Sequence, residues 1–200
     1  MTTICHPRLH DGPIHRRPAG PEQATPDRFD RGDSHPTAGA PPAEIVSHLV
    51  QVHHRSLRDG LLWVESLIDK AVEEHPASRE WSAIFRKFAE LHDELACCLL
   101  HERSAVLPAF ASGVCDDWPG LRDAVRAIGK THARLLQRFW TLTAQVAAAG
   151  RAAPAGEESE ALAAELSDLV DDYYQHLFEE ECLLFPQLAA VKANGAGTFE

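Results

Sequence analysis

Apolar residues recur at alternating steps of four and three along most of the chain after residue 43, a spacing that lines them up on one face of an α-helix. Helix-breaking residues interrupt this pattern at Pro76, over residues 112–120 and over residues 150–156. The first and third interruptions are short, which favours antiparallel neighbours. The pattern predicts an all-α, up-down-up-down four-helix bundle, with apolar stripes over residues 50–75, 84–105, 121–146 and 162–183.

The two ends of the chain lack this periodicity. Residues 1–42 hold eight of the thirteen prolines and few large apolar residues, so they cannot bury enough surface to offset the entropy lost on ordering. We therefore expect a disordered Pro/Gly-rich tail over residues 1–42, the bundle over residues 43–191, and a frayed C-terminus over residues 192–200.

Charge and cysteine content narrow the possible partners and compartment. The formal net charge of −11 argues against nucleic acid, and no run of apolar residues is long enough to span a membrane. The N-terminus has no apolar signal segment, and the five cysteines include no Cys-x-x-Cys pair. We expect a cytoplasmic protein with reduced thiols that binds neither nucleic acid nor membrane.

Six polar or thiol side chains fall on the stripes that should form the core. One buried histidine is usually a hydrogen-bonded core residue, but several imidazoles and carboxylates together are costly to bury without a compensating charge. Counted along antiparallel helices, all six lie at about the same height. The pattern therefore predicts a metal site in the bundle core. Its candidate ligands are His54, Cys98, Glu102, His132, His176 and Glu180.

An internal repeat supports this interpretation. A shift of 78 residues carries His54 to His132, and it carries the pair Cys98 and Glu102 onto His176 and Glu180. In each pair the residues are four apart, so they share a helix face and can reach one ion.

Two hairpins related in this way predict two ions side by side, bridged by the two glutamates. The expected division assigns one ligand set to each hairpin. The sets are His54, Cys98 and Glu102 for one ion, and His132, His176 and Glu180 for the other.

Three segments resemble the hemerythrin-like HHE cation-binding domain: residues 53–58 (His-His-Arg-Ser-Leu-Arg), the pair His176 and Glu180, and residues 184–186 (Leu-Phe-Pro). The resemblance covers about residues 43–190 and is nearest to the di-iron iron–sulfur cluster repair proteins. It implies a non-haem iron centre with two Fe ions per chain, held by histidines and bridging glutamates. It also implies chemistry with O₂, nitric oxide or oxidative stress.

The chain departs from this family at two places. Cys98 stands where the first hairpin should present a histidine, so it either binds metal as a thiolate or fills space and leaves a ligand position vacant. His101, one turn further on, is an alternative replacement. The tail contains only Cys5, whereas the repair proteins carry a small cysteine-containing N-terminal domain.

Three functions remain open from the sequence. The first is binding or sensing of O₂ or nitric oxide, or a redox response to oxidative stress. The second is iron donation to a client protein for iron–sulfur cluster repair. The third is a metal-free, degenerate bundle that acts as an interaction module. The residues favour a metal-binding or sensor protein over a catalyst, and no catalytic residue is predicted.

The other conspicuous polar residues are assigned to surfaces or helix ends. In the run of residues 179–181 (Glu-Glu-Glu), only Glu180 is expected to point inward. Tyr173 is interpreted as a core aromatic, with a hydrogen bond near the site as the alternative. The remaining histidines are expected in the tail (His6, His10, His15, His35), at a helix end (His75), or at the surface or behind the ligands (His48, His53, His92, His101).

Overall fold

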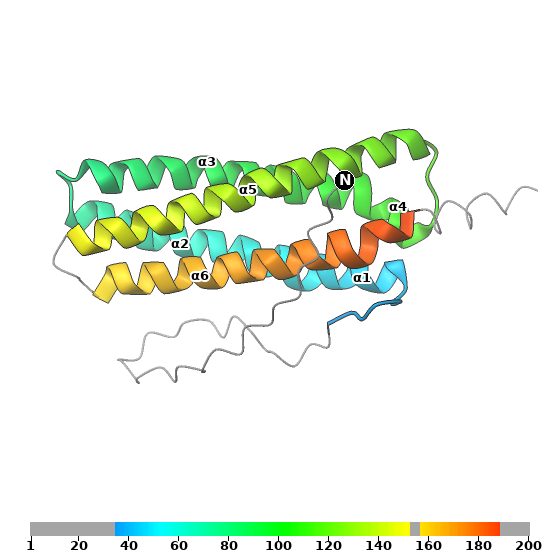
Figure 1. Cartoon of the computed structure of the whole chain (residues 1–200), viewed down its shortest axis with the longest axis horizontal. Coiled ribbons are helices and arrows are strands. Elements are labelled where there is room, and N and C mark those ends of the chain that lie inside the picture. The colour runs from blue at the N-terminus through cyan, green and yellow to red at the C-terminus, as the bar shows by residue number, and fades with distance from the viewer. Residues whose placement is uncertain (1–34, 153–156, 189–200) are drawn as a thin grey trace, which may run out of the picture. The chain divides into compact units, whose positions relative to one another are not determined.

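The computed structural model describes residues 35–152 and 157–188, and the regular structure of these residues is helical (Figure 1). The chain divides into residues 1–35 and residues 36–200, and the helices belong to the second unit. The prediction of an all-α four-helix bundle is confirmed. In the described part of the chain, the helices of at least 21 residues are α2 (His54–Glu74), α3 (Arg79–His101), α5 (Trp118–Ala152) and α6 (Glu157–Phe178).

The four long helices form a closed ring of neighbours. Both α2 and α5 pack against α3 and α6, so consecutive long helices are neighbours and the first also contacts the last (Figure 1). The connection between α2 and α3 is short, whereas the one between α3 and α5 carries the short helix α4 (Leu107–Ser112). This is the up-down-up-down order expected from the loop lengths.

Local chemistry explains where several helices begin and end. Ser78 caps α3, because its Oγ accepts a hydrogen bond from the backbone N–H of Trp81 at 3.2 Å. Helix α4 ends at Gly113, whose φ of 71° lies in the left-handed region that glycine adopts without strain. A first helix, α1 (Pro42–His48), begins with a proline, which costs nothing at this position because its missing N–H would be unpaired.

Among the described residues, two apolar clusters form the core. The larger lies between the four long helices, and the smaller lies at the end of the bundle where α1, α4 and the beginning of α5 meet. The predicted metal-ligand candidates occupy the level between the two clusters. The residues that approach this level from the larger cluster are Leu57, Cys98, Leu135 and Tyr173, and those from the smaller cluster are Leu49, Val106, Ile128 and Leu184.

Three π-helical segments interrupt the α-helices close to this level: η1 (Leu49–His53), η2 (Glu102–Val106) and η3 (Glu179–Leu184). A π turn inserts one residue and is often found at functional sites. In each segment, the residue that is buried is the chain neighbour of the one that the apolar pattern predicted to be buried. The buried residues are Leu49 instead of Val50, Val106 instead of Ala105, and Leu184 instead of Leu183.

Residues just before α1 also pack against the bundle. Ala40 is buried, its N–H donates to the carbonyl of Thr37 at 3.0 Å, and its own carbonyl accepts from Gln187 Nε2 at 3.2 Å. The expectations for residues 1–34 and for the end beyond residue 188 lie outside the described residues. None of the described helices is long and apolar enough to cross a membrane.

Candidate metal centre

The structure brings the six candidate ligands together at one level of the bundle. They come from all four long helices and the π segments next to them. Their exposed fractions are 0% for Glu102, His176 and Glu180, 1% for His132, 4% for His54 and 6% for Cys98. Such a concentration of buried donors is what a metal centre requires, because unpaired charges would not be stable there.

These donors fall into two sets that share Glu102. The four-residue group contains His54, Glu102, His176 and Glu180, and the three-residue group contains Cys98, Glu102 and His132. Within each set, one donor atom per residue lies within 4.8 Å of all the others.

The grouping differs from the expected division by hairpin. His176 joins His54 in the four-residue group, and Cys98 joins His132 in the three-residue group. This grouping is possible because α2 packs against α6 as well as α3, and α5 packs against α3 as well as α6. Each set is therefore completed across the interface between hairpins, which the repeat alone does not specify.

The two oxygens of Glu102 face different groups. Oε1 lies 2.9 Å from His132 Nε2 and accepts a hydrogen bond from the Cys98 thiol at 3.0 Å. Oε2 lies 3.4 Å from His54 Nε2 and 3.6 Å from His176 Nε2. This arrangement allows one carboxylate to contact both groups at once.

Glu180 lies between imidazoles in a similar way. Its Oε2 is 3.5 Å from His132 Nε2 and 3.7 Å from His176 Nε2. Glu102 therefore approaches histidines from three helices, and Glu180 approaches histidines from two.

Several donor atoms of the four-residue group are buried and have no hydrogen-bond partner among the described residues. They are His54 Nε2, Glu102 Oε2, both ring nitrogens of His176 and both carboxylate oxygens of Glu180. Each such atom costs about 1–3 kcal/mol if nothing pairs with it.

Their spacing suits a shared ion better than direct hydrogen bonds. Donors bound at about 2.1 Å from one ion lie roughly 3.0–3.4 Å apart at right or tetrahedral angles, close to the 3.4–3.7 Å separations found here. Imidazole and carboxylate donors suit iron and its first-row neighbours. The residues therefore fit the implied metal.

Two donors hold the protonation state that metal binding needs. Burial opposes ionisation of Glu102, but the hydrogen bond from His132 and the adjacent imidazoles of His54 and His176 outweigh it and lower the pKa of Glu102 well below its usual value. Burial lowers the pKa of His176 to about 3, so its imidazole is neutral at pH 7. Both are ready to donate electron pairs to a cation.

Three further groups favour their protonated forms and would give up that proton when a metal binds. Burial and the charge of Glu102 raise the pKa of Glu180, and burial raises the pKa of Cys98 to about 11. Burial also disfavours the charged form of His132, yet hydrogen bonds to Cys98, Glu102 and Glu181 raise its pKa to about 12. Metal uptake by this centre should therefore release protons.

Tyr173 forms one wall of the centre. Its ring stacks on His176 with a centroid distance of 6.0 Å and an interplanar angle of 20°, and it meets His132 edge-on at 6.1 Å. The side chain is fully buried, and its hydroxyl has no hydrogen-bond partner among the described residues. Tyr173 is thus a core aromatic that contacts two of the imidazoles.

The histidines set aside by the sequence analysis behave differently from one another. His101 is exposed and belongs to neither group, so it does not take the place of the missing histidine. His75 ends α2 and stacks on Trp81 at 6.3 Å. His53, expected at the surface or behind the ligands, is 2% exposed.

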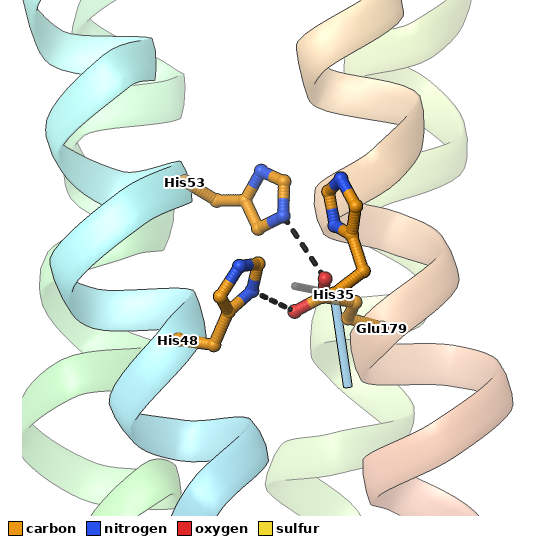
Figure 2. Close-up of side chains that lie close together, drawn as sticks. All are labelled: His35, His48, His53 and Glu179. Atoms are coloured by element: carbon orange, nitrogen blue, oxygen red, sulfur yellow. Dashed lines mark hydrogen bonds and ion pairs between the residues drawn. The ribbon is translucent and has the colours of Figure 1, made fainter. Parts of the chain in front are cut away.

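Beside the six candidates lies a second set that the sequence analysis missed, named here the outer cluster: His48, His53, Asp172 and Glu179. Figure 2 shows the imidazoles of His48 and His53 directed at Glu179, which the sequence analysis expected to be solvated. Glu179 is 2% exposed instead. These positions follow from η1 and η3, whose extra residue turns both members of His53-His54 and of Glu179-Glu180 inward.

His53 is the centre of the outer cluster. Its Nδ1 lies 3.0 Å from Asp172 Oδ1, and its Nε2 lies 3.2 Å from Glu179 Oε1. Burial disfavours the charged imidazole, but the two carboxylates outweigh it and raise the pKa of His53 to about 9. The doublets His53-His54 and Glu179-Glu180 were the only sequence signal for this arrangement.

Comparison with known proteins agrees with the site. A search of curated proteins found no relative. The family model described as the hemerythrin HHE cation-binding domain matches residues 46–196, which is more than half of the chain and includes both groups. The helical bundle, its buried histidines and carboxylates, and this match lead to one assignment. The chain belongs to the hemerythrin HHE cation-binding domain family.

Proposed function

We propose that this protein holds two non-haem iron ions in its core and binds O₂ or nitric oxide there, as a sensor or in a redox response to oxidative stress. The observation that carries the proposal is the position of Glu102, whose two oxygens face two different sets of buried donors. Reduced iron supplies electrons and an open coordination position for a small diatomic molecule. The protein supplies the donors, the enclosure and the exclusion of water.

The two donor sets are unequal, which supports binding of an additional small ligand. One ion would be held by the four-residue group and the other by the three-residue group, with Glu102 common to both. The smaller set includes Cys98, whose thiolate form is a softer donor than imidazole. An ion with fewer protein donors keeps room for a ligand from outside.

Burial limits the size of that ligand. The carboxylates and imidazoles of both groups are at most 4% exposed, and apolar clusters lie on both sides of their level. A diatomic molecule can reach such a site through small fluctuations of the packing, whereas a large substrate cannot. This enclosure supports binding of O₂ or nitric oxide rather than chemistry on a metabolite.

The same features weigh against the two other functions considered. Iron donation for cluster repair needs an ion that leaves readily, and deeply buried donors slow its release. A metal-free interaction module would leave several buried polar atoms unpaired, at a cost of about 1–3 kcal/mol each. Both alternatives remain distinguishable by experiment.

The first experiment is metal analysis of protein expressed with ample iron and purified without a chelator. We expect close to two irons per chain in the wild type and a clear loss in His176→Ala. The matched control is His101→Ala, which changes an exposed histidine one residue from Glu102. Absence of iron from the wild type would exclude the proposed centre.

The second experiment follows the visible absorption of the reduced, iron-loaded protein as O₂ or nitric oxide is added. Binding without loss of iron is the expected result. If instead iron leaves the protein when an apo acceptor of iron–sulfur clusters is added, and no spectral change occurs with either gas, donation replaces binding as the function.

A further inference from the structure

The outer cluster has the composition and geometry of a metal site of its own. Glu179 uses both carboxylate oxygens, with Oε2 at 2.8 Å from His48 Nδ1 and Oε1 at 3.2 Å from His53 Nε2 (Figure 2). A donor atom from each of these three residues lies within 4.8 Å of the other two. The two histidines come from the α1–η1 segment and the glutamate from η3, so the cluster joins two elements far apart in the sequence.

These separations agree with three donors around one ion. Donors about 2.1 Å from an ion and at right angles to one another lie roughly 3.0 Å apart, between the two distances that Glu179 makes to the histidines. Two imidazoles and one carboxylate form a donor set that divalent first-row transition metals use with further positions left open.

Besides the three donors, the cluster has a carboxylate, Asp172, that orients one of its histidines. Its Oδ1 lies 3.0 Å from Nδ1 of His53, on the opposite side of the ring from Nε2 and Glu179. Metal-bound histidines commonly donate their other ring N–H to such a carboxylate, which orients the ring and directs the free nitrogen to the ion. His53 and Asp172 are 2% and 6% exposed, so this orientation is enforced by packing.

We propose that the outer cluster binds a single divalent first-row transition metal ion through His48 Nδ1, His53 Nε2 and the Glu179 carboxylate. Asp172 is a positioning residue that holds the His53 ring. The four-residue and three-residue groups are together called the central pair. The outer cluster shares no donor with either of them, although His53 and Glu179 are chain neighbours of His54 and Glu180. The His48 side chain is 10% exposed, which places this donor closest to solvent and leaves room for water to complete the coordination.

The site is tested with Co²⁺ added to full-length, metal-stripped protein, with bound ions counted by equilibrium dialysis and followed by visible absorption. The wild type is compared with the two variants His48→Gln and His176→Ala and with one control. His101→Gln is the matched control, because it removes an imidazole that belongs to no donor set. We expect the wild type and the control to bind one more Co²⁺ per chain than His48→Gln.

The variant His176→Ala separates this proposal from the proposed function. It should reduce binding at the central pair and keep the ion that depends on His48. If His48→Gln binds as many Co²⁺ ions as the wild type, the outer cluster is a metal-free network of ion pairs and the proposal is wrong. Loss of Co²⁺ from the central pair alone would count against the proposed function and not against the outer site.

A second variant covers the case in which His48→Gln fails to fold, as judged by circular dichroism. Asp172→Asn retains all three donors and removes only the charge that orients His53. Loss of such a partner lowers metal affinity by roughly 10–100-fold, and we expect this decrease for one Co²⁺ only. Unchanged affinity for every ion would overturn the proposal.

Discussion

The thiol of Cys98 donates a hydrogen bond to Glu102 Oε1 at 3.0 Å, one turn away on the same continuous helix. His132 Nε2 lies 2.9 Å from the same oxygen. At the position where the 78-residue repeat calls for a histidine, the chain therefore presents a sulfur atom that already contacts a carboxylate shared by two donor sets. We expect Cys98 to bind metal rather than only fill space, and this expectation can be tested directly.

The variant Cys98→Ser tests metal binding by the thiolate. The replacement is nearly isosteric, but a neutral hydroxyl is a much poorer donor than a thiolate. We expect one of the two irons to be lost to a chelator at least about tenfold faster, in line with the 10–100-fold effects of changes even one shell away from a metal. The measurement is the rate of iron transfer to the chelator. Cys97→Ser, at the exposed neighbouring position, is the control, and equal rates in all three proteins would assign Cys98 to packing.

Glu102→Gln tests the shared carboxylate. Because Glu102 belongs to both groups, its charge would contribute to both proposed ions, so we expect iron content to fall from near two per chain toward zero. Glu90→Gln is a suitable control, since Glu90 is exposed on α3 and forms a surface ion pair with Arg138 at 3.6 Å. Retention of one tightly bound iron in Glu102→Gln would show that the carboxylate serves one group alone.

Bound iron should raise the free energy of unfolding of the protein. A ligand present at 1,000 times its dissociation constant adds about 4 kcal/mol to the free energy of unfolding, which corresponds to a rise in Tm of roughly 10 °C for a domain of this size. We expect this difference between iron-loaded and metal-stripped protein in calorimetry. His176→Ala should show a much smaller difference, and an equal rise in this variant would place the stabilising ion elsewhere.

The metal-free protein should lose stability at alkaline pH through Cys98. Burial raises the pKa of this thiol from 9.0 to about 11, so folding favours the protonated form. The resulting stabilisation is fully present below pH 9 and is lost as the pH rises toward 11. Urea unfolding between pH 8 and 11 measures it, with Cys98→Ser as the reference in which this contribution is absent. Parallel pH profiles for the two proteins would contradict the assignment.

Tyr173→Phe removes a buried hydroxyl that has no partner among the described residues. Because an unpaired buried hydroxyl is unfavourable, we expect the metal-free variant to be more stable by about 1 kcal/mol in urea unfolding. Tyr174→Phe is the matched control, one residue away and 39% exposed, and it should have no such effect. A loss of stability in Tyr173→Phe would mean that the hydroxyl is hydrogen-bonded.

The sequence by itself determined the helical bundle and the level of its polar centre. Helix periodicity, loop breaks and the i, i+4 spacing of Cys98–Glu102 and His176–Glu180 are local properties, readable without knowing which helices touch. For the same reason the stripes correctly placed six polar side chains on faces that turn out to be buried.

Only the tertiary structure decided how these donors combine. The ring order of the helices pairs His54 with His176 and Cys98 with His132, and packing between helices is not encoded in the period of any one of them. The π segments decided which neighbouring residues are also buried at this level. One inserted residue rotates the chain by about 100°, which buries His53 and Glu179 next to candidate ligands that regular helices would have presented alone.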